Sequence, residues 1–310
     1  HYLAAGVAAG NAAGSRWDAL MAERILGPLG MASTYWEFDK VPENRLAIGY
    51  ARDSLTLAPM LHDGSYGAMG GLITTLGDFS KYVSLHLSAW PPRSEPQQGP
   101  VKRYSLRKMQ TPQFPRLNAN ARDWNDTPCP VISGYGYGLS TMENCHGTRR
   151  VSHGGALPGF GSNYVFYPDL GIGLMAFCNV TYTSPWPYEE ILKLLFEDLD
   201  LKPREPGTSE ILKTRQQQVV EWLQEGDNRL EADILAENFF LDEDKKRRMD
   251  RIRPLLEQAG PILGMGEIQP WNQLRGIFEL FGEKDTLQVA FSMSPEPEPK
   301  IQYLEVRKKN

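Results

Sequence analysis

A dense run of glycines between two β-prone segments constrains this chain most. Val151 begins the first segment, and residues 163–167 carry the β-branched and aromatic side chains of the second. Four glycines fall within the eight positions between them: Gly154, Gly155, Gly159 and Gly161. Glycine in a strand often marks a place where a ligand or another backbone approaches closely. The pattern predicts two strands joined by a turn, with an unobstructed edge.

His153 stands at the edge of that opening, directly before Gly154. It is the first candidate for a functional side chain, because the charge of an imidazole near neutral pH depends on its surroundings. The alternative is a glycine-rich hairpin that carries an ordinary polar residue. A short motif does not decide between the two without its context.

Three glycine-containing blocks precede this stretch. They are residues 27–34 (GPLGMAST), 67–78 (GAMGGLITTLGD) and 134–139 (GYGYGL). Together with residues 152–160 (SHGGALPGF), in this order and spacing, they resemble the serine β-lactamases and penicillin-binding-protein-like hydrolases. The nearest likeness is to the class C branch, which includes D-aminopeptidases, D,D-carboxypeptidases and esterases. The resemblance covers roughly residues 1–200.

The resemblance implies an α+β fold of the β-lactamase/transpeptidase type, an antiparallel sheet flanked by helices and incomplete at its N-terminus. It implies transfer of an acyl group from an amide or ester to a serine and then to water. His153 would be catalytic, in the place of the family's lysine or histidine. The Ala156 N–H would be an oxyanion donor, and Gly154 and Gly155 would let substrate lie along the strand. Since Gly154 replaces the hydroxyl residue of Lys-Thr-Gly, the case for strong β-lactam hydrolysis is weakened, whereas an esterase or a D-amino-acid peptidase is compatible.

Residues 35–69 show no sustained periodicity and are expected to form a long, partly irregular excursion. It carries Tyr50, His62 and Tyr66. By resemblance this region walls one side of the substrate cleft, and Tyr50 and Tyr66 are the candidates for that wall. A surface loop anchored by aromatic residues is the alternative for each of them.

The family's nucleophile lies in Ser-x-x-Lys, and Ser105 with Lys108 matches this text. We reject the match, because it falls after the glycine-pair block and is followed by Met109-Gln110-Thr111-Pro112, which fits a later family helix. The Tyr-x-Asn motif is absent from the sequence. We therefore expect both motifs upstream of residue 1 and no nucleophile within this chain. The alternative is a catalytically inactive binding or interaction module.

Periodicity and turn residues predict the remaining elements of residues 1–200. A small-residue helix is expected over 2–13. A second helix, capped by Ser15, should end at Pro28 and Gly30, and Thr75 with Asp78 should form a capping box. Further elements are a short helix over 105–110, a strand over 134–140, a buried central strand over 171–179 that completes an antiparallel meander, and a helix over 186–199.

The character of the chain changes after a proline- and glycine-containing linker at 201–209. Residues 210–259 are helical in pattern, and strands are expected over 262–268, 273–280, 287–292 and 301–306. Helices followed by an antiparallel sheet describe a small α+β domain over 210–310, which resembles NTF2-like or cystatin-like domains in its order of elements. We expect it to be accessory to residues 1–200, with no catalytic role.

The net charge of −5 and the lack of a long basic run argue against a nucleic-acid partner. The run Lys245-Lys246-Arg247-Arg248 is flanked by acidic residues and is expected to be a solvated helix face. No stretch is apolar and long enough to span a membrane. The expected partner is a small-molecule or peptide substrate, and the resemblance favours a periplasmic or extracellular location. The oligomeric state is left open.

The chain has three cysteines, Cys129, Cys145 and Cys178, and five histidines. An odd, low cysteine count predicts no disulfide framework, although Cys129 and Cys145 would be free to pair in an oxidising compartment. The cysteines are isolated and the histidines form no HxxxH or HExxH spacing, so we expect no metal site. The resemblance implies no cofactor.

Overall fold

A computed structural model describes residues 1–60, 64–93, 95–97, 99–123, 125–185, 188–198, 201–226 and 228–309. It divides into two compact units. The N-terminal unit comprises His1–Trp90 and Gln97–Arg204, and the C-terminal unit comprises Pro91–Pro96 and Glu205–Asn310. His62, Trp186 and Leu199, which entered the predictions above, lie outside the described residues.

The N-terminal unit is built on a six-stranded sheet in which every strand pairs antiparallel with its neighbour in sequence. The strands are β1 Arg116–Asn118, β2 Val131–Gly136, β3 Leu139–Glu143, β4 Arg149–Leu157, β5 Phe160–Tyr167 and β6 Ile172–Cys178. The α-helices are α1 Tyr2–Ala13, α2 Trp17–Met21, α3 Gly27–Leu29, α4 Leu76–Leu87, α5 Arg103–Met109 and α6 Tyr188–Asp198. A π-helical turn, Ala22–Leu26, joins α2 to α3, and short 3-10 turns lie at Phe38–Lys40, Glu43–Arg45 and Gly64–Ala68, the last labelled η4. The predicted meander is confirmed. The expected buried central strand over 171–179 is wrong in its position, because β6 lies at the edge of this sheet and none of its residues is buried.

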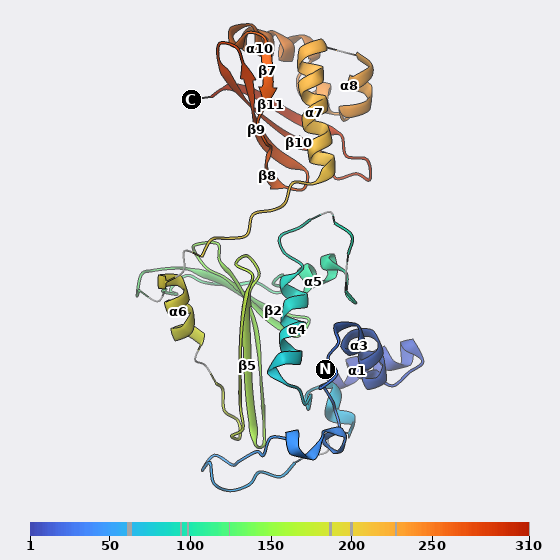
Figure 1. Cartoon of the computed structure of the whole chain (residues 1–310), viewed down its shortest axis with the longest axis vertical. Helices are drawn as coiled ribbons and strands as arrows, with labels where there is room; N and C mark the ends of the chain where they lie inside the picture. Colours follow the sequence, from blue (N-terminus) through green and yellow to red (C-terminus); the bar gives the residue numbers. More distant parts are fainter. Residues whose placement is uncertain are drawn as a thin grey trace. The chain divides into compact units, whose positions relative to one another are not determined.

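Helices cover both faces of this sheet. Successive residues of a strand point to opposite faces, so neighbouring residues of β5 pack against different helices. On one face, Phe166 of β5 packs in a cluster with Val83 of α4. On the other, its neighbour Val165 packs with Leu192 of α6. Figure 1 shows α4 and α6 on opposite sides of the strands. The predicted antiparallel sheet flanked by helices is confirmed.

The expected single strand over 134–140 is wrong. The chain turns back at Tyr137 and Gly138, whose φ angles of 53° and 77° are both positive, and β2 pairs with β3 as a tight hairpin. Two consecutive positive φ angles are what a two-residue turn of the type I′ class requires. A tyrosine rarely adopts such a φ, so the alternating glycines and aromatics resembled one strand.

Of the two predicted helix caps, Thr75 is confirmed and Ser15 is wrong. Thr75 caps α4, since its hydroxyl accepts a hydrogen bond of 3.1 Å from the Asp78 N–H. The Asp78 carboxylate instead accepts bonds from the Ser33 N–H at 2.7 Å and from Lys81 at 2.8 Å, so it ties the preceding segment to the helix. The cap of α2 is Arg16, not Ser15, whose hydroxyl donates to the Arg16 carbonyl.

Cys129 and Cys145 form a disulfide that closes a loop of 16 residues around the β2–β3 hairpin. The sequence left this pairing open. In the chain-entropy description, a loop of this length stabilises the folded state by roughly 3 kcal/mol. Cys178 is the free cysteine, at the end of β6. None of the helices in the described part of the chain has the length and apolar composition that a membrane crossing needs.

The C-terminal unit has helices followed by a sheet, as predicted, so the small α+β domain is confirmed. Its helices are α7 Glu210–Glu225, α8 Asn228–Ile234, α9 Phe239–Asp242 and α10 Lys245–Ala259. Its strands are β7 Ile262–Met265, β8 Gln269–Asn272, β9 Arg275–Gly282, β10 Thr286–Met293 and β11 Ile301–Lys308. The sheet runs β11-β10-β9-β7, and β8 also pairs with β9. The strand predicted over 262–268 ends at Met265, and β8 was missed. The likeness to NTF2-like or cystatin-like domains stays a prediction.

The basic run at the start of α10 is not a uniformly solvated face. Lys246 is exposed, but Arg248 is 5% exposed. Its guanidinium lies 4.1 Å from the centre of the Phe239 ring and donates to the carbonyls of Phe239 and Leu304. A buried charge is tolerated only where such hydrogen bonds replace water, so Arg248 joins α10 to α9 and β11.

Candidate functional site

The edge of β4 is open from His153 onward. β4 pairs with β3 only through its first part, from Arg149 to Ser152. Its pairing with β5 continues from Val151 to Leu157. Among the described residues, no strand therefore adjoins residues 153–157 on the β3 side, and Gly154 to Leu157 are exposed. An unpaired strand edge offers backbone donors and acceptors to an extended ligand.

His153 belongs to a hydrogen-bonded series with two tyrosines. Its Nε2 lies 3.0 Å from the hydroxyl of Tyr135 on β2, and the two ring centres are 5.8 Å apart. The Tyr135 hydroxyl lies 2.9 Å from that of Tyr2, the first residue of α1. α1, which is far from β2 and β4 in sequence, thus meets both strands at the open edge of β4.

Tyr135 is neutral in this series. Partial removal from water raises the pKa of Tyr135 to about 12, and the hydrogen bond with Tyr2 adds to the effect. A neutral phenol both donates and accepts a hydrogen bond. Sequence reasoning did not propose Tyr2 or Tyr135 for the site. The only signal was the alternation of glycine and aromatic residues over 134–139.

Aromatic residues line the sheet face on which His153 lies. Tyr164 of β5 is directly opposite His153 in the register. Its ring is 4.9 Å from that of Phe79 on α4, and Tyr82 packs in the same cluster. Burial raises the pKa of Tyr164 well above its usual value, so this hydroxyl also stays protonated. The side chain paired with His153 across the two strands is therefore aromatic and uncharged.

Packing requires a glycine at position 154, in addition to the functional role predicted for Gly154. A Cβ atom at this position would lie 2.4 Å from Oδ1 of Asn163, which is 7% exposed. The Asn163 amide donates to the Ser184 hydroxyl at 2.6 Å and is not free to move away. At Gly155 a Cβ would meet only the hydroxyl of Ser162, at 2.8 Å. Any side chain at Gly154 would displace a buried, bonded amide.

Tyr50 and Tyr66 contact different parts of the N-terminal unit. The Tyr50 carbonyl accepts bonds from the N–H and hydroxyl of Thr181, and that hydroxyl also accepts from the Gly159 N–H at 2.7 Å. Tyr50 is thus tied to the tip of the β4–β5 hairpin. Tyr66 is 63% exposed on η4, which packs on α1 through a close approach of Ala68 to Gly6. Their role as a cleft wall stays a prediction.

A family model described as Beta-lactamase matches residues 1–197. The chain belongs to the beta-lactamase family. A curated relative, an unguisins hydrolase of Aspergillus campestris (strain IBT 28561), is 26% identical over an alignment of 189 residues, with 58% of this chain and 32% of the relative covered. Residues 1–197 include all six strands of the N-terminal sheet, so the family assignment and the observed architecture concern the same unit.

Two solved structures are also similar. The octameric penicillin-binding protein homologue from Pyrococcus abyssi is 18% identical, with 95% of this chain and 56% of that chain covered and a TM-score of 0.45. The D-amino acid amidase from Ochrobactrum anthropi SV3 is 21% identical, with 64% and 55% covered and a TM-score of 0.44. The chain spans about a third of the curated relative and just over half of each of these structures.

Ser105 lies on α5. Its neighbour Leu106 is buried with Leu85 and Ala89, which anchors the helix to the end of α4. Lys108 is exposed, and its carbonyl accepts a bond from Gln113. In this family member α5 therefore has a packing role, and the exclusion of Ser105 as nucleophile stays a prediction.

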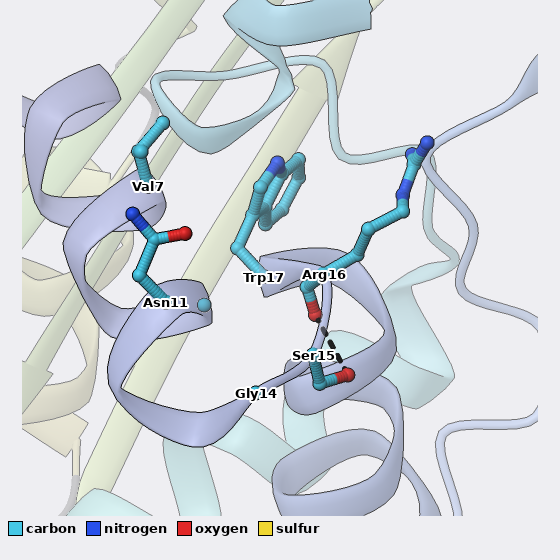
Figure 2. A pocket seen from close by; sticks show the side chains of 7 residues that line it. Val7, Asn11, Gly14, Ser15, Arg16 and Trp17 are labelled. Carbon is cyan, nitrogen blue, oxygen red and sulfur yellow. Dashed lines mark hydrogen bonds between the residues drawn. The ribbon is translucent and has the colours of Figure 1, made fainter.

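Two further features lie outside the His153 series. Cys129, Cys145 and His146 have side-chain atoms within 4.8 Å of one another, but the two sulfurs are bonded to each other and so offer no thiolate to a metal. A hollow of about 660 Å³ lies between α1 and the start of α2. Figure 2 shows Asn11 and Trp17 among the residues at its border. Its lining contains none of the predicted site residues.

Proposed function

We propose that residues 1–200 form the histidine-bearing side of a serine-hydrolase site, which cleaves an amide or ester through an acyl-serine intermediate. The observation that carries the proposal is the open edge of β4, with His153 held at its start by Tyr135 at 3.0 Å. The Ser-x-x-Lys and Tyr-x-Asn motifs of the family would be supplied by residues outside this sequence. The catalytic serine would then face the edge of β4.

In this proposal the open edge binds the reacting group. The Ala156 N–H would be one of two donors to the developing oxyanion, and a preorganised donor of this kind accelerates acyl transfer roughly 100- to 1000-fold. Gly154 and Gly155 present bare backbone, so an extended substrate would run along the strand. His153 would contact a substrate oxygen and would lie near the proton carrier of the missing motif.

The substrate class is narrowed by Gly154. The hydroxyl residue of Lys-Thr-Gly does not fit at this position, since its Cβ would overlap Asn163. We therefore favour D-peptide amides and carboxylic esters over β-lactams as substrates. The curated relative is an unguisins hydrolase, so unguisins belong among the amides to be tested.

The test compares two histidine variants in the protein as its source makes it. His153→Ala should lower kcat/KM on the best amide or ester by roughly 100-fold or more, as expected for loss of a group that acts in the transition state. His146→Ala, at an exposed histidine, should leave kcat/KM unchanged. Equal activity of the two variants would contradict the proposal. No turnover of any amide, ester or β-lactam would favour the alternative, an inactive binding module.

A further inference from the structure

The Tyr2–Tyr135–His153 series fixes which ring nitrogen of His153 is engaged. Nε2 is bonded to Tyr135 at 3.0 Å, and among the described residues no hydrogen bond reaches Nδ1. Tyr135 is in turn bonded to Tyr2 at 2.9 Å, so its hydroxyl has a partner on both sides. A partner on one ring nitrogen decides what the other nitrogen can offer.

Two directions of hydrogen bonding are possible along the series. In one, Tyr2 donates to Tyr135 and Tyr135 donates to Nε2, which places the proton of the neutral imidazole on Nδ1. In the other, Nε2–H donates to Tyr135 and Tyr135 donates to Tyr2. For neutral histidine the first is favoured, because a phenol is a stronger donor than an imidazole N–H and an imidazole nitrogen is a stronger acceptor than a phenol oxygen.

We propose that Tyr135 is a positioning residue which, by occupying Nε2 of His153, leaves Nδ1–H as the donor that this histidine presents to an oxygen of the substrate. The substrate contact rests on the function proposed above, whereas the proton position does not. The ligand chemistry is a carboxylate or carbonyl oxygen placed near the start of the open edge of β4.

The Tyr135 hydroxyl can both donate and accept a hydrogen bond, so Nδ1 of His153 carries a proton whether the imidazole is neutral or charged. When His153 is protonated, Nε2–H donates to Tyr135, and Tyr135 donates to Tyr2. When it is neutral, both bonds reverse, and Nδ1 carries a proton in either case. Because the Tyr135 pKa is raised to about 12, its hydroxyl keeps its proton and can donate a hydrogen bond in both charge states of His153. Recognition of a substrate oxygen would therefore survive deprotonation of His153, losing the charge but keeping the donor.

Close backbone packing holds the strand on which Tyr135 lies. Gly134 and Gly136 flank it, and a Cβ at either would lie within 2.7 Å of Pro112 or Gln113. The segment after α5 thus packs closely on β2, which fixes the strand from which Tyr135 projects. The position of the hydroxyl is set by backbone packing rather than by a flexible loop.

The experiment reads the tautomer of His153 by long-range ¹H–¹⁵N correlation in protein labelled with ¹⁵N-histidine. His153 is assigned by the signals lost in His153→Gln, and the spectra compared are those in which its imidazole is neutral. We expect the proton on Nδ1. In Tyr135→Phe the population of this tautomer should fall below half, since nothing then holds Nε2 as an acceptor. Tyr137→Phe, at an exposed tyrosine of the same hairpin, should leave it unchanged, and Tyr2→Phe should preserve it.

A proton on Nε2 in the unaltered protein would overturn the inference, and so would an unchanged tautomer in Tyr135→Phe. The signals of His86 and His146 report whether a variant keeps its fold, so a loss of structure is recognised separately. The readout needs no turnover. If His153→Ala retained full activity while the tautomer changed as expected, the proposed function would fail and the positioning role would stand.

Discussion

The two units of this chain bury their apolar side chains in different ways. In the described part of the C-terminal unit, 19 buried residues form one continuous cluster that includes Trp222, Phe239 and Phe291. The N-terminal unit is nearly twice as long, yet its described residues form three separate clusters of four, three and three buried residues. The C-terminal unit therefore has a single core, whereas the apolar side chains of the N-terminal unit are divided among several small clusters.

The candidate site lies in the unit with the divided core. α1, which supplies Tyr2, has no charged residue, and of its twelve residues, all described, only Gly10 is buried. Val7 is 57% exposed, and both Tyr66 of η4 and Met69, which follows η4, are more than half exposed. Regions that bind ligands are commonly drawn from the less stable part of a structure. The comparison teaches that the C-terminal unit contains one continuous core, whereas apolar side chains of α1 and η4 in the described part of the N-terminal unit are exposed.

The largest expected effect follows from separating the two units. Residues 205–310 expressed alone should unfold in one cooperative transition, because their core is continuous within the unit. Residues 1–204 alone should bind the dye ANS and unfold over a broad range, because their exposed apolar surface is extensive. Urea unfolding followed by circular dichroism compares them. A sharp transition without dye binding in residues 1–204 would contradict the proposed difference between the two units.

Within the C-terminal unit, truncation of Trp222 should be costly. It is 1% exposed, and its indole N–H donates to Glu231 at 3.0 Å. Trp222→Ala should lower the free energy of unfolding by about 3–5 kcal/mol, as large-to-small core changes do. Trp271 is 55% exposed, and Trp271→Ala should cost less than about 1 kcal/mol. Similar costs for the two variants, measured by urea unfolding, would argue against a single core.

Acid should weaken the N-terminal unit through His86. This histidine is 1% exposed between Tyr82 and Phe166, and burial lowers its pKa from 6.5 to about 4. Below pH 6.5 the unfolded chain therefore binds a proton that the folded chain does not. Stability should be full above pH 6.5, fall by roughly 3 kcal/mol between pH 6.5 and 4, and level off below pH 4.

The variant His86→Gln separates this effect from general acid sensitivity. It should flatten the slope of unfolding free energy against pH between 6.5 and 4, whatever its absolute stability. His146→Gln changes a histidine that is 58% exposed and should keep the original slope. An unchanged slope in His86→Gln would show that other groups cause the acid response.

The smallest expected difference compares one helix cap from each unit. Ser209 accepts from the Leu212 N–H at 3.2 Å and donates to the Gln273 carbonyl at 2.6 Å, and it is 2% exposed. Thr75 of the N-terminal unit is only partly buried. Ser209→Ala should cost about 2 kcal/mol and Thr75→Ala about 1 kcal/mol in urea unfolding. The reverse order would show that the cap in the N-terminal unit is the more tightly held.

Local patterns predicted the part of the fold that depends on local chemistry. The glycine run with β-prone flanks predicted β4 and β5, and the apolar run after Gly171 predicted β6. The turn at Tyr137 was missed because tyrosine seldom takes a positive φ, and only the pairing of β2 with β3 enforces it. Ser15 was named as a cap by residue type alone, while the structure begins α2 one residue later.

The candidate site was predictable only in part. His153 and its glycines carry a readable motif, but the hydrogen bond between Tyr2 and Tyr135 joins residues 133 positions apart. No periodicity or spacing encodes such a contact, since it depends on how α1 is placed beside the sheet. The overlap between a side chain at position 154 and Asn163 is likewise a property of the paired strands.

The central claim is that catalysis uses His153 together with a serine outside this sequence. It is tested most directly by labelling the protein from its native source with a fluorophosphonate probe and mapping the modified peptide by mass spectrometry. We predict one labelled serine, on a peptide absent from residues 1–310, with labelling strongly reduced in His153→Ala. A label on a serine within residues 1–310, Ser105 above all, or no label at any serine, would contradict the account.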